Sequence, residues 1–84
     1  ELQIVQRKVP GIDSRLATHI VQFVQRVRQL SLRKPPSISE TLDWAMALVV
    51  LGASVLSREL LVDTLNILLK DKDDIARALR EAGR

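Results

Sequence analysis

Cysteine and tyrosine are absent from this chain of 84 residues, and glycine and proline occur only three times each. Without cysteine the chain forms neither disulfides nor thiolate metal sites. This composition is compatible with a reducing compartment, and we expect a cytoplasmic location. The scarcity of glycine and proline leaves few turns, which favours helices over strands. Because Phe23 and Trp44 are the only aromatic residues, the core must consist of Leu, Val, Ile and Ala.

Long apolar runs and a strong charge excess are also missing. The longest charge-free segment, Trp44 to Ser57, is shorter than the ~20 residues that a membrane-spanning helix needs. The net charge of +3, from 13 basic and 10 acidic residues, is a mild excess, whereas nucleic-acid-binding proteins usually concentrate more charge on one face. No charged start leads into an apolar signal-peptide core. We therefore expect neither a membrane nor a nucleic acid as partner.

Catalytic and metal-binding motifs are absent as well. The phosphate-binding pattern G-x-x-x-x-G-K-[ST] does not occur. The single histidine, His19, has no second histidine and no cysteine with which to bind a metal. No serine has an evident base to activate it. We therefore predict no catalytic residue, no metal ligand and no cofactor within these 84 residues.

Apolar residues recur at helical spacing in four segments, and no alternating strand pattern is present. Residues 1–10 have the pattern of the tail of a preceding helix, which ends at a proline followed by a glycine. Short connections predict that consecutive helices pack antiparallel or crossed. We therefore expect a single all-α domain over residues 1–84, a small four-helix bundle with a short extra N-terminal helical segment. The four expected helices cover residues 12–30, 38–51, 58–70 and 73–82.

The start of the second expected helix is the best-marked boundary in the chain. Two prolines precede Ser37, and Ser37 with Glu40 gives the S-x-x-E spacing of a capping box. Beyond Asp43 this helix is apolar on all sides, so we expect it to be central and covered by its neighbours. Gly52 suits the position just after its end.

The first expected helix begins after Asp13, a suitable N-cap. Along one flank of its apolar stripe lie three residues with basic side chains, Arg15, His19 and Arg26. Two interpretations stay open for this flank. It is either an ordinary solvated edge, or a basic edge that faces an anion or an acidic neighbour such as an adjacent subunit.

The second and third expected helices, with the short turn between them, resemble a helix-turn-helix. The helix that would contact DNA is Arg58–Lys70, and it exposes the acidic residues Glu59 and Asp63 beside Arg58 and Asn66. Acidic side chains would repel phosphates, so plain helix packing is the preferred interpretation. Two alternative functions are kept: a free-standing helical protein-interaction module and, less favoured, a DNA-binding domain.

Four stretches together resemble the C-terminal helical lid of a MoxR-type AAA+ ATPase. The nearest likeness is the subgroup encoded with CO-dehydrogenase maturation factors and von Willebrand A-domain proteins. The block K-P-P-x-x-x-E-T-L-D-W is the most specific part, whereas the leucine-rich parts alone would not identify the family. The four stretches are V-P-G-I at Val9–Ile12, F-V-x-x-V-R at Phe23–Arg28, L-x-K-P-P-S-I-S-E-T-L-D-W at Leu32–Trp44 and T-L-N-I-L-L-K-D-K-D-D at Thr64–Asp74.

This resemblance implies that the chain is a fragment of a longer protein. In the family, the lid packs on a P-loop ATPase core of the same chain and closes over ATP, which is bound with Mg. It also contacts adjacent subunits of a ring, usually a hexamer. The parent would hydrolyse ATP and act as a chaperone-like activator of a client metalloenzyme, with a von Willebrand A-domain protein as a further partner.

One position departs from the family pattern. In many AAA+ lids the helix matching Ile38–Leu51 opens with an arginine that reaches the γ-phosphate, and by its spacing to Trp44 that position falls at about Ser39. The unpaired N–H groups of a helix N-terminus suit an anion, and Lys34 could supply the missing charge. We therefore hypothesise that Lys34, Ser37 and Ser39 face the nucleotide. In the alternative, Ser37 and Glu40 only cap the helix, and Glu40 would repel phosphate.

Overall fold

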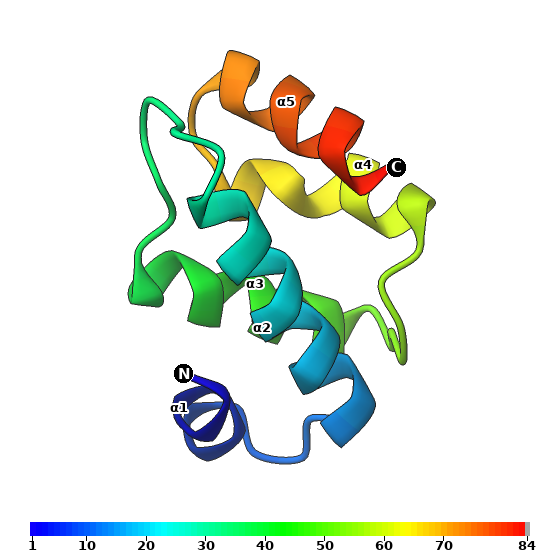
Figure 1. Ribbon diagram of the computed structural model, residues 1–84. Helices are drawn as coiled ribbons and strands as arrows, with labels where there is room; N and C mark the ends of the chain where they lie inside the picture. The colour runs from blue at the N-terminus through cyan, green and yellow to red at the C-terminus, as the bar shows by residue number, and fades with distance from the viewer. Residues whose placement is uncertain (84) are drawn as a thin grey trace.

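The computed structural model describes residues 1–83 and contains five helices in that range, with no strand (Figure 1). This confirms the predicted all-α class and the small helical bundle with a short additional helix at its N-terminal end. No helix in the described part of the chain is long and apolar enough to cross a membrane. The helices are α1 (Leu2–Lys8), α2 (Ser14–Arg28), α3 (Ile38–Val50), α4 (Arg58–Leu68) and α5 (Lys72–Ala82).

Helix α2 begins at the predicted cap. The Asp13 carboxylate accepts hydrogen bonds from the backbone N–H groups of Arg15 (2.8 Å) and Leu16 (3.2 Å). The helix ends at Arg28, two residues before the predicted end. The reason lies in the next residues, where Leu30 N–H bonds to the carbonyl of Val27 and Ser31 takes a left-handed φ of 56°, so the last turn tightens and the helix cannot continue.

Helix α3 begins at the predicted residue and ends at Val50, one residue before the predicted end. Ser37 and Glu40 form the capping box, which confirms the pattern found in the sequence. Gly52 has a φ of 74° and follows the C-cap Leu51. The N–H of Ala53 bonds to the carbonyl of Leu48 and that of Gly52 to Val49, which is the Schellman arrangement that glycine permits because it lacks a Cβ.

The core forms around α3, which packs against α1, α2 and α4 (Figure 1). Trp44 lies at its centre with no exposed surface. Its ring is 5.6 Å from the ring of Phe23 between centroids, and its indole N–H donates to the Thr64 hydroxyl at 2.8 Å. The two aromatic residues of the chain therefore join α2, α3 and α4 at one point. Most of the core is Leu, Val, Ile and Ala as expected, but Phe23 and Trp44 also belong to it, so the prediction of a purely aliphatic core was wrong.

The expectation that α3 is covered on all sides was wrong. Val50 is 85% exposed and Met46 is 45% exposed, and Ile38 and Leu51 are also exposed. Helices α1, α2 and α4 cover the side of α3 that carries Trp44, while the remaining helix, α5, packs against α4. We call the exposed apolar pair Met46 and Val50, which lie one turn apart on the side of α3 away from Trp44, the α3 face.

Helices α4 and α5 differ from the prediction at their junction. α4 ends at Leu68, because the buried Leu69 is extended, and the Lys70 ammonium donates to the carbonyl of Ile67 at 3.0 Å. α5 begins at Lys72 and not at residue 73, because Asp71 is its N-cap and accepts from the N–H groups of the next two aspartates. The linker is therefore residues 69–71, one residue longer than the predicted linker of residues 71–72.

Candidate functional site

The loop between α2 and α3 carries Lys34 and is fastened to the start of α5. The carboxylate of Asp74 is buried, with 3% exposed, and accepts hydrogen bonds from the backbone N–H groups of Arg33 (3.0 Å) and Lys34 (2.9 Å). The Arg33 guanidinium lies 3.4 Å from Asp73 and 3.9 Å from Asp71. In Figure 1 the loop accordingly rises from α2 to the first turn of α5. The Lys34 residue itself is exposed.

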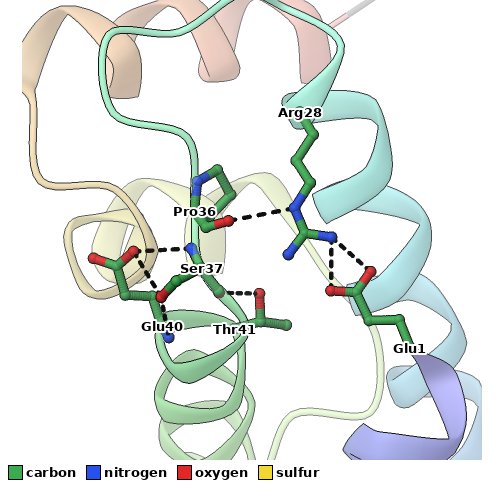
Figure 2. A network of polar contacts seen from close by, with 6 residues as sticks. All are labelled: Glu1, Arg28, Pro36, Ser37, Glu40 and Thr41. Carbon is green, nitrogen blue, oxygen red and sulfur yellow. Dashed lines mark hydrogen bonds and ion pairs between the residues drawn. The ribbon is translucent and has the colours of Figure 1, made fainter.

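The other end of this loop is fastened to α1 and α2 (Figure 2). The Arg28 side chain donates from Nε to the carbonyl of the buried Pro36 at 3.3 Å and from Nη1 to Glu1 Oε1 at 2.7 Å. Glu1 Oε2 lies 2.7 Å from the same nitrogen. It is buried and accepts no hydrogen bond, so charge attraction alone holds this second oxygen. The start of α3 thus has a fixed position relative to α1 and α2.

The polar groups at the start of α3 satisfy one another. The Ser37 hydroxyl accepts from the N–H of Glu40 at 3.1 Å, and Glu40 Oε1 accepts from the Ser37 N–H at 3.0 Å. The hydroxyl of Thr41 donates to the Ser37 carbonyl (Figure 2). Ser39 is exposed. The capping role of Ser37 and Glu40 is confirmed, and the nucleotide-facing role of Lys34, Ser37 and Ser39 stays a prediction.

The basic flank of α2 borders a hollow of about 190 Å³. Of the three flank residues, His19 and Arg26 line this hollow, whereas Arg15 does not. Across from them lie the segment before α4, α4 itself and the end of α5. The guanidinium carbon of Arg26 lies 5.9 Å from the centre of the Phe23 ring. The lining residues, which we call the α2 pocket, are His19, Gln22, Phe23, Arg26, Leu56, Leu61 and Ala82.

Helix α4 exposes the side chains predicted for the helix-turn-helix alternative, Arg58, Glu59, Asp63 and Asn66. The Arg58 guanidinium donates to the carbonyl of Leu79 at 3.2 Å, near the end of α5. Arg58, one of the two side chains on α4 that could contact DNA, is therefore bonded within the bundle. The carboxylates of Glu59 and Asp63 are exposed on the same helix. DNA binding stays the less favoured alternative.

Two features of these sites were not predicted from the sequence. They are the contact of Asp74 with the loop before α3 and the apolar wall of the α2 pocket. Both depend on residues about 40 or more positions apart in the chain, since Asp74 meets Lys34 and Ala82 meets His19. No local pattern in the sequence signals such pairs.

Comparison with known proteins adds no relative to this description. No family model, no curated protein and no solved structure matches the chain. Within residues 1–83, no group of three or more histidine, aspartate or glutamate side chains is placed to hold a metal ion.

The N-cap of α5 predicts a pH dependence of stability. The backbone N–H of Asp74 donates to the Asp71 carboxylate and lowers its pKa below the ordinary value of 3.8. The Asp71 carboxylate is therefore protonated more readily in the unfolded chain than in the folded chain. Its contribution to the free energy of unfolding is complete above about pH 4 and is lost as the pH falls through the lower pKa of the folded state. Asp71→Asn keeps a capping side chain but cannot titrate.

We expect the urea midpoint of the Asp71→Asn chain to fall less steeply below about pH 4 than that of the original chain. Other carboxylates titrate in both chains, so the difference between the two curves isolates residue 71. Parallel curves over this range would show that the Asp71 cap does not couple folding to proton binding.

Proposed function

We propose that this chain is the helical lid of a MoxR-type AAA+ ATPase. In this proposal it packs on a P-loop core elsewhere in the parent chain, closes over ATP and Mg, and contacts adjacent subunits of a ring. The parent acts as a chaperone-like activator of a client metalloenzyme, in the cytoplasm. The lid performs no chemistry itself, and its contribution is to change position as nucleotide is bound and hydrolysed.

The observation that carries the proposal is the folding of the stretch Lys34–Trp44, the most specific part of the resemblance. The prolines lead into a loop whose two ends are fastened to α5 and to α1 and α2. The serine and glutamate form the capping box, and the tryptophan fills the core. The segment that resembles the family therefore holds the bundle together as one body, which is what a rigid-body movement of a lid requires.

The α3 face supports a protein partner. Val50 and Met46 are large apolar side chains exposed one turn apart on α3, and such patches commonly mark surfaces that another protein or domain covers. A P-loop core of the same chain is the occupant that the proposal implies. The same observation favours the second candidate function, a free-standing helical interaction module, equally well.

The coding sequence upstream of Glu1 separates these two functions. The lid proposal expects a Walker A motif, G-x-x-x-x-G-K-[ST], and a Walker B aspartate to be encoded in the same reading frame. The interaction-module alternative expects a start codon directly before Glu1. Sequencing the complete reading frame decides between them without any biochemical assay.

A first prediction from the proposal concerns Lys34. In the intact ATPase, Lys34→Ala should weaken ATP binding by about fivefold, the size expected for losing one exposed charge contact of about 1 kcal/mol. Lys8→Ala removes another exposed lysine, on α1, and serves as the matched control. Nucleotide affinity is measured by titration and turnover by phosphate release. Unchanged affinity and unchanged turnover in Lys34→Ala would remove this residue from the nucleotide site.

A second prediction concerns the α3 face. We expect the isolated chain to self-associate through this face at high concentration, and Val50→Lys to suppress that association. A lysine near the end of α3 also suits the helix dipole, so the free energy of unfolding should change by less than about 0.5 kcal/mol. Light scattering over a concentration series makes the measurement, with Gln25→Lys on the exposed side of α2 as the charge control. A strictly monomeric original chain would contradict the prediction.

A further inference from the structure

The α2 pocket is a built hollow with two kinds of wall. Phe23 and Leu61 form its apolar part and are 5% and 6% exposed. They come from α2 and α4, while Leu56 precedes α4 and Ala82 ends α5. Three helices therefore fix the position of the apolar wall, because each contributes a residue that is also packed into or against the core. The polar wall is the flank of α2.

The size of the hollow fits one side chain. An apolar cavity of about 150 Å³ is large enough to hold benzene, whereas sites for drug-sized molecules usually measure about 300–1,000 Å³. A volume of about 190 Å³ lies just above the first figure and below the second range. The pocket therefore suits a single large apolar side chain that projects from a partner surface, the usual form of an interface anchor.

The basic residues of the pocket determine which residues of the partner should flank that side chain. His19 and Arg26 stand seven residues apart on α2, two turns along the same side of the helix, and none of the lining residues is acidic. Neither side chain forms a hydrogen bond or ion pair with the part of the chain that the structure describes, residues 1–83. Their hydrogen-bond donors are available to carboxylates that flank the incoming side chain.

We propose that the α2 pocket is a docking site for an acidic segment of a partner protein, which inserts one aromatic side chain between flanking carboxylates. The aromatic ring contacts Phe23 and Leu61, and the carboxylates contact Arg26 and His19. Arg26 already lies over the Phe23 ring, and a planar guanidinium offers its second face to another ring while its edge binds a carboxylate. This inference stands independently of the lid proposal, since it involves neither nucleotide nor a P-loop core.

The test uses the capped pentapeptide D-E-F-E-D, titrated into the isotope-labelled chain and followed by backbone amide NMR. We expect saturable shifts at the amides of Phe23, Leu56, Leu61 and Ala82, with a dissociation constant on the order of 1 mM, as suits one side chain in one pocket. The peptide N-Q-F-Q-N tests the carboxylates and D-E-A-E-D tests the ring. Each should bind at least about fivefold more weakly.

Matched variants of the protein assign the contact. Arg26→Gln should weaken binding of D-E-F-E-D by about fivefold, whereas Arg15→Gln should change it by less than about twofold. Both arginines are exposed on α2 and both variants lose one charge, but only Arg26 lines the pocket. Equal effects of the two variants, equal binding of N-Q-F-Q-N, or shifts spread away from the pocket would each overturn the proposal. Unchanged far-UV circular dichroism confirms that the variants are folded.

Discussion

The Trp44→Ala chain is expected to lose about 3–5 kcal/mol of its free energy of unfolding, the usual cost of removing a large buried side chain. Trp44 has no exposed surface, and it meets Phe23 from α2 and Thr64 from α4. Small domains have about 5–15 kcal/mol of stability in total, so this one substitution removes a large share of it. Urea unfolding followed by far-UV circular dichroism gives the value, because the signal does not depend on the missing indole.

A control separates the hydrogen bond of Trp44 from its packing. In Thr64→Val the indole N–H loses its acceptor while the ring stays in place, and an unpaired buried donor costs about 1–3 kcal/mol. The Thr64 hydroxyl also donates to the Leu60 carbonyl within α4, a contact that the variant removes as well. The expected order of stability is therefore original chain, then Thr64→Val, then Trp44→Ala. A Trp44→Ala chain as stable as Thr64→Val would contradict the central packing role of the ring.

Features that depend on neighbouring residues could be predicted from the sequence. Ser37 and Glu40 are three residues apart, and the side chain of each accepts a hydrogen bond from the backbone N–H of the other. Their spacing alone therefore predicts the start of α3. Gly52 ends the same helix because only glycine takes a left-handed φ without a steric cost. The fold class followed in the same way from apolar residues at helical spacing.

Features that depend on distant residues could not be predicted. The sequence places many apolar residues on α3, but which of them are covered depends on where α1, α2 and α4 lie, and Val50 is left open. The basic flank of α2 was visible as a pattern, yet its separation into Arg26 at a pocket and Arg15 outside it depends on Leu56 and Ala82, which come from later segments. Charge patterns predict that a side chain is polar but not what stands opposite it.

The contact of Asp74 with the loop before α3 also depends on distant residues. Its substitution is the second change from which we expect a large loss of stability. Asp74→Ala should lower the free energy of unfolding by about 2–3 kcal/mol, because two backbone N–H groups lose a charged acceptor. Those groups belong to Arg33 and Lys34, which lie 41 and 40 residues earlier in the chain. The variant should therefore loosen the loop before α3 while leaving α3 itself capped by Ser37. Urea unfolding measures the first effect, and amide hydrogen exchange at Arg33 and Lys34 measures the second.

Asp73→Ala is the matched control for Asp74→Ala, since it removes a neighbouring carboxylate from the same turn. Asp73 is exposed and its carboxylate pairs with the side chain of Arg33 at 3.4 Å, and an exposed pair of this kind contributes about 1 kcal/mol or less. Equal destabilisation by the two variants would mean that general loss of negative charge at the start of α5, and not the buried carboxylate, explains the effect. Faster exchange at the two loop amides in Asp74→Ala alone would instead identify Asp74 as the group that holds Lys34 in place. Under the lid proposal, freeing the loop in Asp74→Ala and removing the ammonium in Lys34→Ala should weaken nucleotide binding by separate routes.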